Sequence, residues 1–67
     1  MDTQYYVEGK YKDGTDFFEG FFTSVDSLIE ETNARNNEEL KYPVTVFEQV
    51  ENYRGDTITK PMFNLNK

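Results

Sequence analysis

The sequence predicts an α+β fold, in which an antiparallel sheet of three or four strands carries one helix on one face, in the chain order β-β-α-β-β. Three observations support this. An Asp-Gly pair separates two aromatic-rich runs, a capped amphipathic segment follows them, and a β-branched run comes next. We expect a single domain over residues 1–67, because a chain of this length holds one core at most.

The first two strands are predicted over residues 5–12 and 15–22, joined by a two-residue turn at Asp13-Gly14. This turn places Lys10 opposite Phe17. Because side chains alternate along a strand, Phe18 then faces the helix and Phe17 lies on the other face of the sheet.

A helix should follow the hairpin, since residues 23–26 fit a capping box in which Thr23 is the cap and Asp26 returns to it. Its apolar stripe has i, i+3, i+4, i+7 spacing and is about one face wide, so the helix should lie on the sheet. We expect it to end near Arg35 to Asn37, where asparagines suit a left-handed cap. The stripe consists of Val25, Leu28, Ile29 and Thr32.

A third strand is predicted over residues 44–50, opened by Pro43, and a short fourth strand over residues 57–60, which Pro61 either ends or confines to a sheet edge. The segment between them, residues 53–56, is typical of a turn. It contains an Arg-Gly-Asp tripeptide, and we favour the turn over an integrin-binding role. The predicted core consists of Tyr5, Val7, Phe18, Phe22, Val25, Leu28, Ile29, Val44, Val46 and Val50.

Composition excludes several kinds of chemistry. The chain has no Cys and no His, so the commonest general base, the thiolate nucleophile and the best transition-metal ligands are missing. We therefore expect no catalytic, cofactor-binding or metal-binding residues, and a protein that is not an enzyme. The net charge of −6 disfavours direct nucleic-acid binding.

A cytoplasmic location is the simplest expectation. The first residues, Met1 to Gln4, lack the basic and apolar regions of a secretory signal. No apolar run exceeds three residues, so we expect no membrane-spanning segment.

The first candidate site is aromatic. Tyr6, Phe17 and Phe21, joined by Phe47, give the predicted sheet a second apolar face that one short helix cannot also cover. Three covers remain open: the tail from Met62 to Leu65, a second copy in a homodimer, or a partner protein.

The second candidate site is acidic. Glu30, Glu31, Glu38 and Glu39 lie on and after the predicted helix. They form either a solvated helix face or a track that docks on a basic surface of a partner protein. A DNA mimic is the weaker form of the second interpretation.

The order of elements resembles the layout of small phage-encoded inhibitor proteins, with residues 24–29 in the helix and residues 43–47 in the strand that follows. The resemblance covers residues 5–50 in layout only, and residues 52–67 have no counterpart in it. It implies an acidic protein-binding protein that inhibits a host enzyme or host defence system stoichiometrically in the host cytoplasm. The alternatives are an acidic DNA mimic in a nucleic-acid-binding groove, or a carboxylate-dependent enzyme or metal-binding domain.

Overall fold

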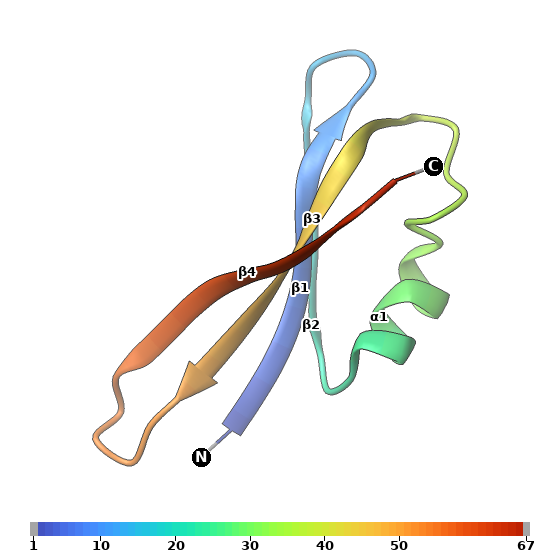
Figure 1. Cartoon of the computed structure of the whole chain (residues 1–67). Helices are drawn as coiled ribbons and strands as arrows, with labels where there is room; N and C mark the ends of the chain where they lie inside the picture. Colours follow the sequence, from blue (N-terminus) through green and yellow to red (C-terminus); the bar gives the residue numbers. More distant parts are fainter. Residues whose placement is uncertain (1, 67) are drawn as a thin grey trace.

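The computed structural model describes residues 2–66, which form one helix and one four-stranded antiparallel sheet (Figure 1). The strands follow the spatial order β2-β1-β3-β4, so β1 and β3 are central. The predicted α+β class and the chain order β-β-α-β-β are confirmed. The elements are β1 (Asp2–Tyr11), β2 (Asp16–Phe22), α1 (Val25–Thr32), β3 (Leu40–Glu51) and β4 (Thr57–Leu65).

The turn between β1 and β2 has three residues, one more than predicted. The Tyr11 N–H donates to the Thr15 carbonyl at 2.8 Å, and the Gly14 N–H donates to the Tyr11 carbonyl at 3.0 Å. Gly14 takes the left-handed conformation with φ 94°. The Asp13 carboxylate accepts hydrogen bonds from the Thr15 N–H at 2.9 Å and the Thr15 hydroxyl at 2.6 Å. This is a type I turn closed by a left-handed glycine, in which only Gly14 needs positive φ.

The extra turn residue makes the predicted hairpin register wrong by one position. Lys10 lies opposite Asp16, and Phe17 lies opposite Gly9. Because a one-residue slip moves each side chain to the other face, Phe17 enters the core at 3% exposure and Phe18 is 51% exposed on the opposite face. Two assignments are thereby corrected: Phe18 is not a core residue, and Phe17 is not a surface residue.

A bulge in β2 restores the predicted register at the far end of the hairpin. Tyr5 lies opposite Phe22, as predicted, whereas Val7 lies opposite Glu19. One residue of β1, Tyr6, therefore faces two residues of β2, Gly20 and Phe21.

The helix begins one residue later and ends earlier than predicted. Its N-cap is Ser24, whose hydroxyl accepts from the Ser27 N–H at 3.1 Å, so the assignment of Thr23 as the cap is wrong. Its C-cap is Asn33, with φ 53° and an N–H that donates to the Ile29 carbonyl at 3.1 Å. An asparagine does end the helix, but it is the first one available.

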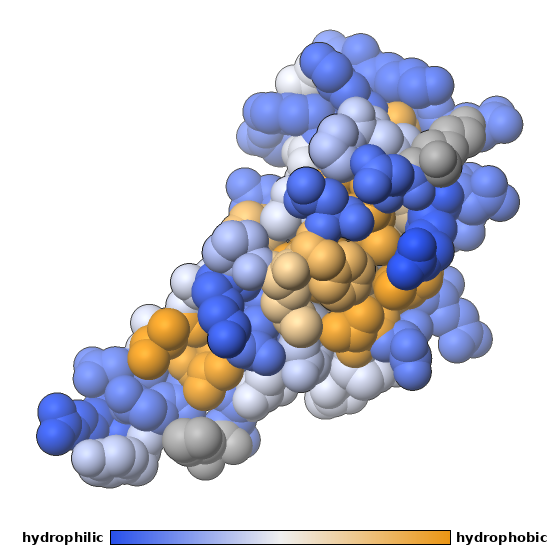
Figure 2. Space-filling view, in the orientation of Figure 1, coloured by the Kyte–Doolittle hydropathy of each residue, from blue (hydrophilic) through white to orange (hydrophobic). Residues whose placement is uncertain are grey.

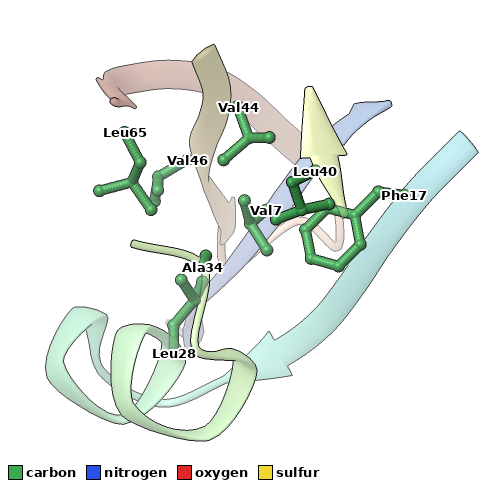
Figure 3. Close-up of a cluster of buried hydrophobic side chains, with 8 residues drawn as sticks. All are labelled: Val7, Phe17, Leu28, Ala34, Leu40, Val44, Val46 and Leu65. Carbon is green, nitrogen blue, oxygen red and sulfur yellow. The ribbon is translucent and has the colours of Figure 1, made fainter. Parts of the chain in front are cut away.

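The core lies between the sheet and the segment that contains α1 and the loop after it (Figure 3). The loop is fastened by Tyr42, whose hydroxyl donates to the Ala34 carbonyl and accepts from the Asn37 N–H. Ala34, Leu40 and Leu65 are buried although the sequence patterns did not place them in the core. The buried hydrophobic residues are Val7, Phe17, Leu28, Ala34, Leu40, Val44, Val46 and Leu65.

Strand β4 continues past Pro61 to Leu65, so the fourth strand is longer than predicted, and Pro61 lies within an edge strand instead of ending it. Proline is tolerated because β4 is an edge strand, and the register shifts next to it, between Val46 and Phe47. Leu65 is 1% exposed and packs in the core. Since residues 61–65 extend the sheet edge, the interpretation in which this segment folds over the second face is also wrong.

The turn between β3 and β4 is confirmed. The Asn52 side chain accepts from the Arg54 N–H at 2.8 Å and from the Asp56 N–H at 3.0 Å, and Gly55 has φ 84°. The Arg-Gly-Asp tripeptide therefore forms part of a hairpin turn that is closed by an asparagine side chain.

The register predicts unequal losses of stability when two neighbouring phenylalanines are replaced. Phe17→Ala should lower the free energy of unfolding by about 3–5 kcal/mol, because it removes a buried ring. Phe18→Ala should cost about 1 kcal/mol, since half of that ring is already in water. Urea denaturation measures both values, and a larger loss for Phe18→Ala would contradict the observed register.

The cap assignment can be tested in the same way. Ser24→Ala should destabilise the protein by about 1 kcal/mol, because the Ser27 amide loses its hydrogen-bond acceptor. Thr23→Ala is the matched control and should change stability by less than about 0.5 kcal/mol. Thermal unfolding compares the two variants, and the reverse order would return the cap to Thr23.

Candidate protein-binding face

The two faces of the sheet have different surroundings. Helix α1 and the loop after it lie against one face, where α1 contacts β1 and β2 (Figure 1). Within residues 2–66, no helix or loop lies against the opposite face, which we call the open face. Side chains on the open face therefore depend on their strand neighbours for cover.

Four rings gather on the open face, and we call them the aromatic cluster: Tyr6, Phe18, Phe21 and Phe47. Tyr6 is central. Its ring stacks on Phe47 with centroids 5.0 Å apart and an interplanar angle of 11°. It also meets Phe18 at 5.2 Å and Phe21 at 5.6 Å, the latter edge to face. These are favourable aromatic geometries. Phe18 and Phe21 remain 51% and 49% exposed.

The bulge in β2 is what places both outer rings on one face. In a regular strand, residues three apart point to opposite faces. The additional residue opposite Tyr6 lets Phe18 and Phe21 share the open face, where their ring centroids are 6.0 Å apart. Gly20 is needed here, because a Cβ at this position would lie 2.7 Å from the Cβ of Tyr6.

The structure brings together three of the four predicted aromatic residues, Tyr6, Phe21 and Phe47. It replaces the fourth, Phe17, with Phe18. The pattern of aromatic residues in β2 is compatible with either choice, so the turn length decides which phenylalanine is exposed. The Asp-Gly signal alone does not distinguish a two-residue turn from a three-residue turn that ends in a left-handed glycine.

The environment of Tyr6 favours its neutral form. Burial raises the pKa of the Tyr6 phenol above its usual value, and the negative charge of Glu8 raises it further. Tyr6 is thus a neutral hydrogen-bonding group at the centre of the aromatic cluster at physiological pH.

The predicted acidic residues lie apart from the aromatic cluster. Glu30 and Glu31 lie on α1, on the opposite side of the sheet. Glu38 and Glu39 form a turn before β3, next to the β1–β2 hairpin, where the Lys12 N–H donates to the Glu39 carbonyl at 2.8 Å. Figure 1 shows α1 and this turn at different positions along the sheet, so the four carboxylates are divided between two regions.

A hollow of about 530 Å³ lies between that turn and the hairpin. Hydrogen bonds from the Thr15 hydroxyl and then from its amide hold the pKa of Asp13 below its usual value. Asp13 therefore stays ionised and completes the turn, which is unlike a general acid, whose pKa must be raised. The lining residues are Tyr11, Lys12, Asp13, Thr15, Glu38 and Glu39.

Two kinds of feature are missing from the part of the chain that the structure describes. Within residues 2–66, no three Asp or Glu side chains are grouped closely enough to hold a metal ion. Over the same residues, no helix has the length and apolar character needed to cross a membrane.

Hydrophobic residues also reach the surface along β4. Figure 2 shows them in the middle of the molecule, where β4 crosses in front of the sheet, and separately toward the β3–β4 hairpin. The exposed apolar side chains of β4 are Ile58, Met62 and Phe63. Ile58 is separated from Met62 and Phe63, and none of the three takes part in an aromatic pair like those around Tyr6.

Comparisons with known proteins returned no relative: no family model, no curated protein and no solved structure matches this chain.

The charge of Glu8 gives a titration test of the cluster. Glu8→Gln should lower the pKa of Tyr6, because one of its two causes is removed. The signal is the difference in alkaline ultraviolet absorbance between each protein and the same protein with Tyr6→Phe. Because the folded-state pKa is raised, Tyr6 contributes stability that is present below about pH 10 and is lost as the pH rises further.

Glu39→Gln is the control, because it removes a carboxylate from the turn before β3 and should leave the Tyr6 titration unchanged. An identical Tyr6 titration in the Glu8→Gln variant would show that Glu8 does not act on the cluster.

Proposed function

We propose that this protein acts by binding another protein, with the aromatic cluster of the open face as the contact surface. One observation carries the proposal: four packed rings lie on a sheet face that no other part of residues 2–66 covers, and two of the rings are about half exposed. Aromatic residues are enriched where protein interfaces are fully buried, and they supply most of the binding energy there.

Two features of the surroundings support binding over catalysis. Charged and polar residues border the cluster, as in the rim of an interface, with Glu8 and Lys10 on one side and Gln4 and Gln49 on the other. The exposed carboxylate of Asp13 is occupied by hydrogen bonds within a turn.

The layout resemblance to small phage-encoded inhibitors extends the proposal to the outcome of binding, which is stoichiometric inhibition of a host enzyme or defence protein. The net charge of −6 fits a partner with a basic surface. Glu30 and Glu31 lie on α1, on the other side of the sheet from the aromatic cluster, so a basic partner surface would meet them there.

Site-specific photo-cross-linking tests the contact surface whatever the identity of the partner. A benzophenone amino acid in place of Phe21, irradiated in lysate, should give discrete protein adducts, because this ring is 49% exposed within the cluster. Adding Phe18→Ser should lower the adduct yield at least tenfold, as expected when an aromatic anchor is lost.

The benzophenone amino acid in place of Ile58 is the matched control. The Ile58 side chain is 56% exposed and apolar, but it lies outside the aromatic cluster. Equal yields from the two positions would overturn the proposal. Mass spectrometry of the adduct then distinguishes a second copy of this chain from another protein.

A further inference from the structure

The open face of β1 and β3 is a ladder of five cross-strand pairs with the aromatic pair Tyr6–Phe47 in the middle. Because β1 and β3 are antiparallel neighbours, alternate pairs from Asp2 to Glu8 share the open face. A register shift follows Glu8, and Lys41 lies on the open face because its neighbour Leu40 is buried in the core. From one end to the other these are Asp2–Glu51, Gln4–Gln49, Tyr6–Phe47, Glu8–Thr45 and Lys10–Lys41.

The two ends of the ladder carry opposite charge. One end has the two carboxylates of Asp2 and Glu51, and the other has the two ammonium groups of Lys10 and Lys41. All four side chains are exposed. Strand β2 adds Asp16, which forms an ion pair with Lys10, so the basic end itself has a net charge of +1 against −2 at the acidic end. Glu8 lies between the basic end and the aromatic cluster and brings that half of the open face to a net charge of zero.

The edge strand β4 adds no charge to this face. Its residues opposite Thr45, Phe47, Gln49 and Glu51 are uncharged. They are Asn64, Pro61, Thr59 and Thr57, respectively. The open face is therefore polarised along the strands only, with the aromatic cluster between the two ends.

Along β1 the charged ends are equally far from the centre. Asp2 and Lys10 are each four residues from Tyr6, which corresponds to about 13 Å in either direction along the strand. Along β3 the irregularity after Thr45 adds two residues on the basic side, so Lys41 is six residues from Phe47 whereas Glu51 is four. Hollows of similar size flank the cluster. One of about 420 Å³ includes Glu8, Lys10 and Thr45, and one of about 430 Å³ includes Asp2, Gln4 and Gln49.

We propose that the occupant of the open face is a second copy of this chain, packed face to face. The two copies are related by a two-fold axis that lies between the two sheets at the Tyr6–Phe47 pair and runs perpendicular to the strands. This proposal rests on the proposed function, in which the aromatic cluster is a protein contact surface, and it assigns that surface to a second copy instead of a host protein. The axis places the Lys10–Lys41 end of each copy over the Asp2–Glu51 end of the other. It also places the Gln4–Gln49 pair of each copy over the Glu8–Thr45 pair of the other, where the Gln4 amide can donate to the Glu8 carboxylate.

A surface with an acidic end and a basic end on opposite sides of an apolar centre can be complementary to itself, which is the requirement for a closed two-fold interface. A foreign partner would not need this symmetry. Packing of two twisted sheets face to face with aligned strands is an established arrangement, and it would bury the exposed halves of Phe18 and Phe21.

Charge reversal at each end tests both the interface and its orientation. The double variant Lys10→Glu with Lys41→Glu makes both ends acidic, and Asp2→Lys with Glu51→Lys makes both ends basic. Each should dimerise at least tenfold more weakly than the wild type, because like charges meet at both ends. An equimolar mixture of the two should recover a heterodimer of near wild-type affinity, measured by sedimentation equilibrium and native mass spectrometry.

The matched control is Arg35→Glu with Arg54→Glu, which changes the net charge from −6 to −10 (two changes of −2), as the double lysine variant does. Arg35 follows α1 and Arg54 lies in the β3–β4 turn, so this control should keep the wild-type dimer affinity. Dimerisation weakened equally in the control would assign the effect to total charge and overturn the proposed interface.

Three other results would also overturn the proposal: a monomeric wild type at millimolar concentration, a mixture that fails to form heterodimers, or a dimer unaffected by Phe18→Ser with Phe21→Ser. A monomeric wild type whose Phe21 position still cross-links to another protein would overturn the dimer alone. The proposed function fails separately, when the Phe21 position gives no more adduct than the Ile58 position.

Discussion

The length of the first turn is the constraint on which the rest of the structure depends. Three turn residues, closed by Gly14 in the left-handed conformation and by the Asp13 carboxylate, place Phe17 opposite Gly9. With one residue fewer, the alternation along β2 would reverse, and Phe18 would enter the core in place of Phe17. A local hydrogen-bonding preference in an exposed turn thus determines which ring stabilises the fold and which is available for contact.

The bulge at Gly20 and Phe21 has the opposite consequence at the other end of β2. It returns Phe22 to its place opposite Tyr5, and it brings Phe21 onto the same face as Phe18. Without the third turn residue, Phe18 would be buried in the core. Without the bulge, Phe21 would lie on the opposite face of the sheet from Phe18. The aromatic cluster is therefore a product of two irregularities in one short hairpin, and each depends on a glycine.

Much of the fold could be predicted from the sequence, because the relevant signals are local. The Asp-Gly pair indicated the hairpin, the stripe with Val25 and Leu28 indicated the helix, and the valines of β3 indicated a strand. The features of the fold that were predicted wrongly are those for which a local sequence pattern fits two different structures. The Asp-Gly pair suits two turn lengths, and Pro61 suits either the end of a strand or the interior of an edge strand.

The candidate site was also predicted only in part from the sequence. Tyr6, Phe21 and Phe47 could be assigned to one face from alternation, because the register near Tyr5 and Phe22 was predicted correctly. Phe18 could not, because it lies between the turn and the bulge, where the predicted register is out by one residue. The acidic residues were identified as a candidate surface, but their separation into two regions depends on the early end of α1 at Asn33, which helix periodicity does not reveal.

The packing of the aromatic cluster bears directly on how tightly the open face can bind. Side chains that must be ordered on association oppose binding, whereas rings already held against one another lose little further freedom. Tyr6 is fixed between Phe47, which stacks on it, and Phe18 and Phe21, which pack against its other sides. The cluster thus exposes apolar area in a conformation that the hairpin has already selected. Because binding also removes this area from water, occupancy of the open face should stabilise a small domain whose core has only eight buried apolar residues among those described.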